Sequence, residues 1–291
     1  MSTVTEYCTS AGDGVVFICD FSPPRTITST YLDSAQQLDA DFICVAYNPG
    51  KSVRIDSAML AHAIEQKAGK KTIFNLATRD MNKLAIQTHL LGAQMLGLEN
   101  VVIVQGDRFT EQDLMLAKEV SDYKPTELIA AVARLNEGID YRGRQLGTPT
   151  NYCIGGSLDL GKGVNREAQL AHRKILAGAH FFIAQPVFDT NVVLQFHESY
   201  HKVAGQPFSL PVFYGLQVLE KDGVVFSSVP QCVKDDLASG RPGTDIALEH
   251  LEEFVNAGIR TIYLMAPILR GGGRNYNSAQ LIIEQARRSG Y

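Results

Sequence analysis

The stretch "NVVIVQGD", residues 100–107, decides the fold, because a buried strand ends there in polar groups. Four consecutive β-branched residues, Val101 to Val104, are typical of a strand that is covered on both faces, as in a parallel sheet. Gln105, Gly106 and Asp107 follow at once. Barrels built of parallel strands place their chemistry at the C-terminal ends of those strands. The stretch therefore predicts both a parallel sheet and one part of its functional site.

Seven other apolar runs of this kind occur along the chain, and segments of helical period separate them. Residues 80–96 predict one such helix, with Asp80 as N-cap and with Leu84, Leu91 and Met95 near one face. Glycines shortly before several runs fit helix C-termini. These glycines are Gly69, Gly97, Gly178 and Gly258. The other runs are 15–20, 41–46, 71–76, 150–155, 180–185, 210–216 and 260–265.

Eight strands alternating with helices over 291 residues predict a single (β/α)8 barrel domain spanning residues 1–291. The alternative is an open doubly wound sheet, but no G-x-G-x-x-G follows the first run. We expect a long loop over residues 134–150, before the fifth strand, and a last helix over 277–289.

Composition excludes several classes of protein. The net charge is −4 and the basic residues are scattered, which disfavours a nucleic-acid partner. No apolar run reaches the roughly 18 residues that a membrane span needs. The N-terminus lacks the basic and apolar regions of a signal peptide. The five cysteines form no C-x-x-C pair, which indicates free thiols and a cytoplasmic location.

Polar side chains stand at the predicted C-terminal ends of most strands. A solubilising rim would also place polar groups there, but the whole set at one mouth favours a site. Only two of its members are carboxylates, so the set suits a large polar heterocycle, with one or two carboxylates as acids or orienting groups. Its members are Asp20, Tyr47, Asn48, Asn75, Gln105, Asp107, Gln185 and Gln217.

Other chemistries lack their residues. No lysine stands at a strand tip, which argues against a Schiff-base enzyme. We find no metal-ligand spacing among histidines and carboxylates and expect no metal site. The seven histidines fall mostly in helical segments, where surface or packing roles are expected. No serine or cysteine has the context of a nucleophile elbow.

Four stretches resemble the methylenetetrahydrofolate reductase family, in the same order along the chain. "DFSPPRT" at 20–26 is similar to the family's EFFPPRT, and residues 75–107 resemble its longest signature. "RKILAGAHFFIAQPVFD" at 173–189 is similar to RKxxAGAxxxITQxxFD, and "GIRTIYLM" at 258–265 fits the closing strand. The resemblance implies a (β/α)8 barrel that binds FAD, takes hydride from NADH or NADPH and passes it to 5,10-methylenetetrahydrofolate, giving 5-methyltetrahydrofolate.

The resemblance also implies roles for residues at the mouth. Asp20 stands where the family has a glutamate that assists protonation of folate N10. Asp107 matches an aspartate that lies by the flavin pyrimidine edge and faces the folate. Gln185 matches a glutamine that hydrogen-bonds the pterin, and we assign Tyr47 and Gln217 to the folate as well.

For the cofactor, the resemblance implies contacts from the ends of the second, third and fourth strands and from the helix after the fifth. Lys174 and Glu167 align with groups that contact the phosphate and ribityl parts of FAD. Gly106 is expected to let the backbone approach a ligand, because it has no side chain. The expected FAD contacts are Tyr47, Asn75, Gln105, Gly106, Asp107, Glu167 and Lys174.

Several positions depart from the family's pattern. Asp20 is one methylene shorter than glutamate, Gln105 replaces an arginine, Asn75 a histidine and Ala46 a threonine; residues 154–157 replace a Tyr-Pro-x-x-His stretch. Two alternatives within the family therefore stay open: a flavin-free enzyme that moves hydride directly, and an enzyme that mainly oxidises methyltetrahydrofolate. A non-redox folate-binding or methyl-handling barrel is a third.

"RGGGRNY", residues 270–276, follows the eighth run, where many barrels bind phosphate. Its backbone amides could cradle a pyrophosphate, with Arg270 or Arg274 supplying charge; a flexible connecting loop is the other interpretation. A phosphate-binding lyase or isomerase would use the same feature. The choice between NADH and NADPH stays open, and a homo-oligomer is a further expectation from the family.

Overall fold

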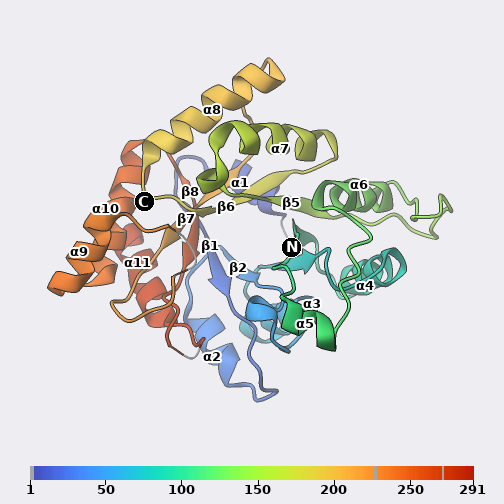
Figure 1. The fold of residues 1–291 in the computed structure, drawn as a ribbon, viewed down its shortest axis with the longest axis horizontal. Coiled ribbons are helices and arrows are strands. Elements are labelled where there is room, and N and C mark those ends of the chain that lie inside the picture. The colour runs from blue at the N-terminus through green and yellow to red at the C-terminus, as the bar shows by residue number, and fades with distance from the viewer. Residues whose placement is uncertain (1–2, 226–227, 271) are drawn as a thin grey trace.

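The computed structural model describes residues 3–225, 228–270 and 272–291. Eight parallel strands pair in chain order, and β1 pairs with β8 to close the sheet into a barrel (Figure 1). This confirms the predicted (β/α)8 barrel, because an open doubly wound sheet would leave two edges unpaired. The strands are β1 (Val16–Phe21), β2 (Phe42–Val45), β3 (Thr72–Ala77), β4 (Asn100–Val104), β5 (Cys153–Leu158), β6 (Phe181–Pro186), β7 (Val212–Gln217) and β8 (Thr261–Met265).

Helices surround the strands on the outside of the barrel (Figure 1). None of the described helices is long and apolar enough to cross a membrane. The helices are α1 (Val4–Ala11), α2 (Thr30–Gln37), α3 (Ser57–Ala68), α4 (Lys83–Met95), α5 (Glu111–Leu116), α6 (Pro125–Asn136), α7 (Val164–Leu176), α8 (Thr190–Ala204), α9 (Gln231–Ser239), α10 (Gly243–Asn256) and α11 (Tyr276–Arg288); short 3-10 turns η1 (Pro49–Lys51) and η2 (Leu160–Lys162) complete the set.

The core has two layers, and the strands alternate between them. On β1, Phe17, Cys19 and Phe21 pack in the layer between strands and helices, whereas Val16 and Ile18 pack inside the barrel. Because successive side chains of a strand point to opposite faces, Asp20 has the inward direction. The period of the sequence thus aims this carboxylate into the barrel at its C-terminal end.

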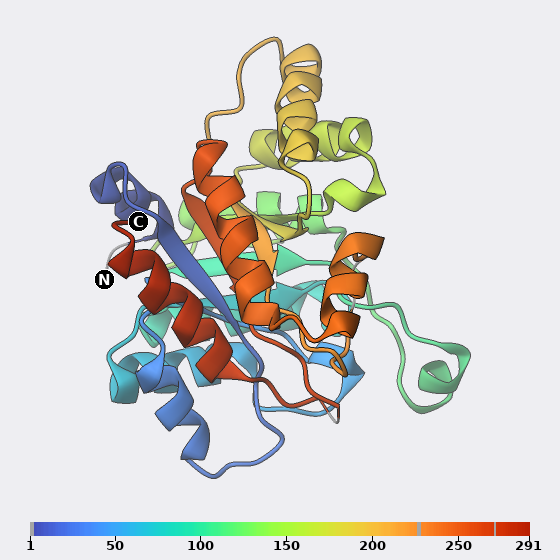
Figure 2. The same cartoon turned by 90° about the vertical axis from the view of Figure 1, so that its left-hand side faces the viewer.

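The N-terminal helix closes the opposite end of the barrel. Val4 is fully buried in the inner core, and its backbone N–H donates to Asn100 Oδ1 at 2.9 Å. Figure 2 shows both termini on one side of the molecule, while the loop that carries α5 projects on the other. That second side is the mouth, where the strands end.

Helix α4 is shorter than predicted and buries a different face. Asn82, not Asp80, caps it, with Oδ1 accepting from the N–H of Ala85 at 2.9 Å. The helix buries Ile86, Leu90 and Ala93. The face that carries Leu84, Leu91 and Met95 is exposed. Asp80 is drawn away from the cap because it pairs with a neighbouring arginine at the barrel mouth.

The fifth strand begins at Cys153 rather than at residue 150. The three preceding N–H groups are already taken: those of Thr150 and Asn151 donate to Leu135 O and Gln94 Oε1, and that of Tyr152 donates to a side-chain oxygen on α6. These bonds outside the sheet delay its start. The other strands lie within two residues of the predicted runs at each end.

Candidate active site

The carboxylate of Asp20 lies almost buried at the end of β1, with a donor on each oxygen. Tyr263 Oη donates to Oδ1 at 3.0 Å from β8, and Arg274 Nη2 lies 2.8 Å from Oδ2. The Arg274 guanidinium also donates to Ala266 O at 3.2 Å. The barrel closure brings these groups together, because it sets β1 beside β8. Asp20 is therefore held as an acceptor of two hydrogen bonds.

Two further polar groups lie inside the barrel near Asp20. The thiol of Cys44 donates to Asn75 Oδ1 at 3.3 Å. Burial raises the pKa of the Cys44 thiol well above its ordinary value, and the charge of Asp20 raises it further. Burial likewise raises the pKa of Tyr263. The Cys44 thiol and the Tyr263 hydroxyl are therefore neutral hydrogen-bond donors rather than anions at physiological pH.

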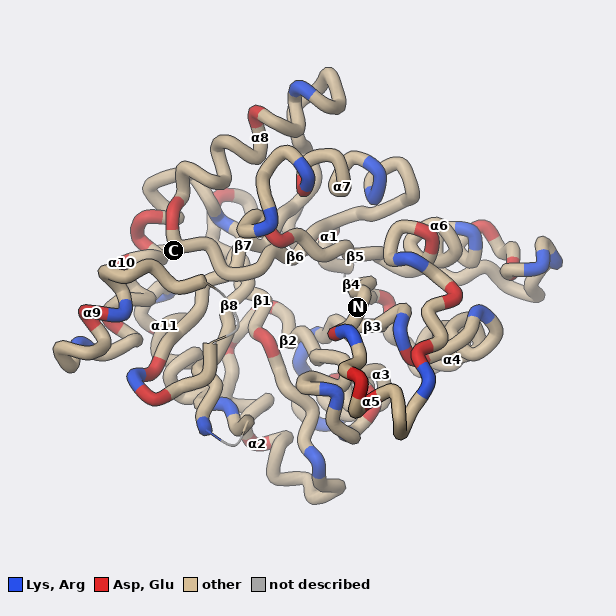
Figure 3. Tube along the Cα trace, viewed as in Figure 1, with Lys and Arg blue, Asp and Glu red and all other residues tan. Residues whose placement is uncertain are grey.

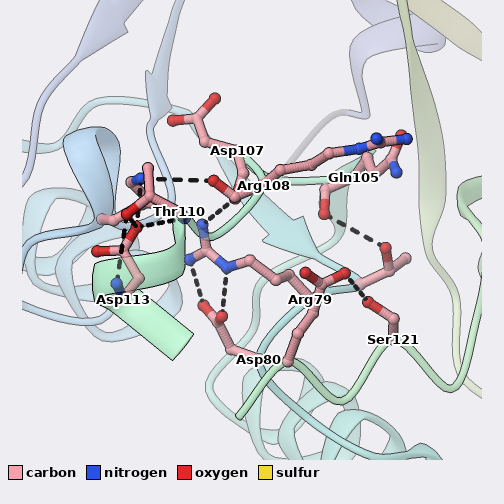
Figure 4. Close-up of polar contacts among 11 residues, drawn as sticks. Arg79, Asp80, Gln105, Asp107, Arg108, Thr110, Asp113 and Ser121 are labelled. Atoms are coloured by element: carbon pink, nitrogen blue, oxygen red, sulfur yellow. Dashed lines mark hydrogen bonds and ion pairs between the residues drawn. The ribbon is translucent and has the colours of Figure 1, made fainter. Parts of the chain in front are cut away.

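Arg79, which sequence reasoning missed, organises the β4 end of the mouth. Its side chain is buried and pairs with both oxygens of Asp80, at 2.5 and 2.7 Å (Figure 4). Nη1 donates to Asp107 O at 2.7 Å, and the guanidinium lies 4.6 Å from the ring centre of Phe109. The carbonyl of Arg79 accepts from Val120 N at 2.9 Å. One arginine thus holds both ends of the loop that carries α5.

Tyr47, predicted at the β2 end, belongs to the same network. Burial raises its pKa first, and the charge of Asp80 and a hydrogen bond to that carboxylate raise it further. The phenol is therefore a neutral donor to Asp80. The network couples the end of β2 to the ends of β3 and β4.

Asp107 differs from the other carboxylate at the mouth. Its side chain is exposed, and no hydrogen bond or ion pair engages the carboxylate within the described chain. Figure 4 shows it directed away from Arg79, which contacts only the backbone of Asp107. Gln105 is exposed too, and its side-chain amide has no hydrogen-bond partner within the described chain. The end of β4 therefore offers unoccupied polar groups to a ligand.

Gly106 makes a different close approach from the one expected. Its φ is +82°, and a Cβ there would lie 3.2 Å from Ala77 Cβ and 3.4 Å from Arg79 Cβ. The glycine therefore permits close packing of the β4 end against the β3 end, in a backbone conformation that side chains disfavour.

A bulge presents Gln185. Ala184 and Gln185 of β6 stand opposite one residue of β7, because Ile183 pairs with Phe213 and Pro186 with Gly215. Such bulges are common beside active sites, where they redirect a side chain. Gln185 is exposed as a result, whereas Gln217, at the end of β7, is buried. The two predicted amides therefore reach the mouth in different surroundings.

The predicted pair on α7 is buried rather than open to the mouth. Lys174 Nζ donates to the carbonyl of Ser157, and Glu167 Oε2 accepts from the N–H of Asp159 at 3.0 Å. Burial lowers the pKa of Lys174 to about 8, against the opposing effect of Glu167. Both groups are engaged by the backbone at the end of β5.

Packing explains the glycines that replace the family pattern on β5. A Cβ on Gly155 would lie 2.5 Å from the ring of Phe181, and one on Gly156 would lie 3.0 Å from the ring of Phe182. The rings fill the space on both faces of β5. Larger side chains are excluded there unless β6 changes as well.

The loop after β8 is a short hairpin, not an open cradle. Ile268 bridges Arg274, and the N–H of Gly272 donates to Leu269 O at 2.9 Å. Arg270 pairs with Asp222 at 3.0 Å. One glycine of the predicted cradle, Gly271, lies outside the described residues. The two arginines expected to hold phosphate both have carboxylate partners.

One helical segment does have a metal-like spacing that the sequence analysis overlooked. "HESYH" on α8, residues 197–201, has the His-Glu-x-x-His pattern of many zinc sites. His197 Nε2, however, lies 3.0 Å from the hydroxyl of Tyr214. No group of three or more His, Cys, Asp and Glu side chains in the described chain is placed to hold a metal ion. The packing of α8 on β7 accounts for His197.

The sequence model of the family described as methylenetetrahydrofolate reductase matches residues 9–268. The chain belongs to the methylenetetrahydrofolate reductase family. The match covers most of the barrel, including Asp20 and the β4 end.

Two solved structures share the fold. One is an uncharacterized protein from Clostridium thermocellum that binds two copies of 5-methyl-5,6,7,8-tetrahydrofolic acid; it is 13% identical, with a TM-score of 0.64 over 90% of this chain and 92% of that one. The other is a long-chain alkane monooxygenase, 9% identical, with a TM-score of 0.55 over 95% of this chain and 92% of that one. At these identities the likeness concerns the fold alone.

Membership of the methylenetetrahydrofolate reductase family implies FAD as a cofactor. The residues at the barrel mouth fit this cofactor in part. Gln105 and Asp107 offer unengaged groups to the edge of a flavin ring. Lys174 and Glu167 do not fit as placed, since each is buried and bonded to backbone. The β4 side of the mouth is thus suited to the cofactor, and the α7 side is not.

Proposed function

We propose that the protein interconverts 5,10-methylenetetrahydrofolate and 5-methyltetrahydrofolate, with hydride from NADH or NADPH and with FAD as the bound carrier. Membership of the methylenetetrahydrofolate reductase family supports the substrate. The observation that carries the proposal is Asp20, a buried carboxylate at the mouth whose two oxygens have fixed donors. FAD, when bound, would relay the hydride.

The reduction needs one proton and one hydride. Protonation of N10 breaks its bond to the bridging carbon and leaves a 5-iminium cation, to which hydride adds to form the methyl group. The proton requires an acid beside N10. We assign that role to Asp20, since Asp107, the other carboxylate in the predicted set, is exposed to solvent at the rim.

The pairing of Asp20 bears on the direction of the reaction. To donate a proton to N10, Asp20 must first take one up, and Arg274 must turn away from Oδ2. In the reverse direction N10 loses a proton, and the same carboxyl group would accept it. One carboxyl group can thus serve both directions, and we propose oxidation of methyltetrahydrofolate as a second reaction of the same site.

Amides on the far side of the mouth would orient the pterin. An amide both donates and accepts, which matches the mixed edge of a pterin ring. We assign this role to Gln185, exposed at the β6 bulge, and to Gln217 at the end of β7. Tyr47 is tied to Asp80, so we assign it to the wall of the site rather than to a reacting atom.

A second candidate is a flavin-free or non-redox folate-binding barrel. The burial of Lys174 and Glu167 favours it, because both groups are engaged by backbone. The sequence favours this candidate too, because Gln105 stands where the family has an arginine.

Purified protein decides between these candidates. We expect a yellow protein with flavin absorbance that reduces methylenetetrahydrofolate with NADH or NADPH and oxidises methyltetrahydrofolate with an artificial acceptor. A colourless protein whose folate reduction is unaffected by added FAD would instead support direct hydride transfer. Folate binding without any turnover would support the non-redox candidate and contradict the proposed reaction.

A further inference from the structure

Three arginines from three different loops gather at one edge of the mouth. Arg25 follows β1, Arg54 follows β2 and Arg274 follows β8. Figure 3 shows basic segments in the loops around α2, on this edge of the barrel. The positive charges of Arg25 and Arg274 lower the pKa of Arg54, after the larger effect of its burial. The three guanidinium groups are thus near enough to interact.

Arg54 is fixed in place without a negative partner. Its Nη1 donates to Pro23 O at 2.7 Å, and its Nε donates to Ser52 Oγ at 2.9 Å and to Pro49 O at 3.3 Å. Nη2 faces the loop after β8 and lies 3.8 Å from where a Cβ on Gly272 would stand. Among the described residues all its acceptors are neutral oxygens, so its charge is oriented but has no carboxylate partner there.

Several other cations at the mouth have carboxylate partners. Lys51 pairs with Asp113 at 2.5 Å, Arg79 with Asp80 and Arg270 with Asp222. Arg274 pairs with Asp20. Arg25 is exposed and has no hydrogen bond or ion pair within the described chain. Within the described chain, Arg25 and Arg54 therefore leave two uncompensated positive charges near Arg274, the partner of Asp20.

We propose that Arg25 and Arg54 form an oxyanion subsite that holds the anionic end of a ligand whose reacting part lies over Asp20. Guanidinium groups bind carboxylates and phosphates in a planar, two-point geometry. Because backbone oxygens already orient Arg54, little ordering is needed on binding. The ligand's identity rests on the proposed function. Two sources supply such oxyanions: the carboxylates of the folate glutamate tail, and the phosphates of the nicotinamide nucleotide.

Isothermal titration calorimetry on Arg25→Gln and Arg54→Gln tests the subsite. The probes are inorganic tripolyphosphate, 5-methyltetrahydrofolate with one or with three glutamates, and NADH. Arg270→Gln is the matched control, since it removes an exposed arginine that already has a partner. Arg54→Lys keeps the charge at a position that also ties two loops together, and circular dichroism checks that each variant folds.

We expect tripolyphosphate binding to weaken by about fivefold in Arg25→Gln, the scale of an exposed charge pair, and to stay unchanged in Arg270→Gln. If the folate tail is the source, the triglutamate binds the wild type more tightly than the monoglutamate and loses this advantage in Arg25→Gln. If the nucleotide is the source, NADH affinity falls instead. Unchanged binding of every probe in both glutamine variants would overturn the subsite.

The tripolyphosphate arm separates the two proposals. If the wild type binds no folate, the proposed function fails, yet dependence of tripolyphosphate on Arg25 still supports the subsite. If folate turns over normally and Arg25→Gln alters no probe, the subsite fails and the proposed function stands.

Discussion

At the scale of the residue, Asp20 and Asp107 share a chemistry and differ in surroundings. Asp20 is buried and accepts from Tyr263 and Arg274, whereas Asp107 is exposed and its carboxylate has no such partner in the described chain. Period and position in the strand place both at the mouth, and the sequence predicted this. Their partners come from distant segments, so no local pattern indicated which carboxylate would be held.

The first prediction concerns Asp20→Asn. Asparagine keeps the shape of the side chain but does not exchange a proton with N10, so reduction of methylenetetrahydrofolate should slow by roughly 10²-fold or more. Oxidation of methyltetrahydrofolate should slow equally, because both directions share one transition state. Consumption of NAD(P)H in the absence of folate should hardly change. Stopped-flow measurement of the two half-reactions gives all three values.

Tyr263→Phe is the matched control for that prediction. It keeps the ring and removes the hydroxyl, which donates to Oδ1 and also hydrogen-bonds the Cys44 thiol. We expect a smaller loss in the folate step than in Asp20→Asn, with the same melting behaviour. Near-normal folate reduction by a folded Asp20→Asn protein would remove Asp20 from the mechanism.

At the scale of the element, the loop between β4 and α6 depends on one side chain. Arg79 binds Asp80 with two nitrogens, donates to the backbone at Asp107 and accepts from Val120 through its own carbonyl. The sequence predicted a loop with polar groups at the β4 tip. It did not predict the clamp, because an arginine after a strand has many possible partners and only the folded loop selects them.

The second prediction is that Arg79→Lys loosens this loop. Lysine keeps the charge but loses the two-point contact with Asp80, and it does not reach the Asp107 carbonyl at the same time. Amide hydrogen exchange over residues 105–121 should quicken, and the free energy of unfolding should fall by about 1–3 kcal/mol. Arg108→Lys, an exposed change in the same loop, should do neither. Unchanged exchange over 105–121 would show that other contacts order the loop.

At the scale of the whole molecule, stability depends on a lysine buried between α7 and β5. The pKa of Lys174 is lowered from 10.5 to about 8. Between these values the unfolded chain holds a proton that the folded chain has released. The contribution of Lys174 to the free energy of unfolding should therefore rise with pH across this window, by up to roughly 3 kcal/mol, and stay level below about pH 8. The buried cysteines contribute in the opposite direction, because burial raises their pKa, so the contribution of Lys174 is read from the difference between wild type and variant.

The third prediction is that Lys174→Met removes this rise. Urea unfolding at about pH 7 and about pH 10, followed by circular dichroism, gives the difference between wild type and variant at each pH. Lys162→Met is the control, because Lys162 is largely exposed and should leave the pH dependence as it is. The same pH dependence in wild type and Lys174→Met would contradict the lowered pKa of Lys174.

The sequence by itself determined the order of strands and helices, the closure into a barrel and the side chains at the mouth. These follow from local regularities: runs of apolar residues, a two-residue period along each strand, and polar residues where a run stops. These regularities alone predicted the strand ends at Gln105, Gln185 and Gln217. The placement of Asp20 inside the barrel rests on the same period.

The tertiary structure alone decided which of these groups are engaged and which are open to a ligand. Closure of the barrel set Asp20 beside Tyr263 and brought Arg274 over it, while packing of α7 against β5 buried Lys174. Hydrogen bonds and ion pairs of this kind form between segments that are remote in the chain. Their partners are chosen by the geometry of the closed barrel and its loops, and a one-dimensional pattern contains no record of that geometry.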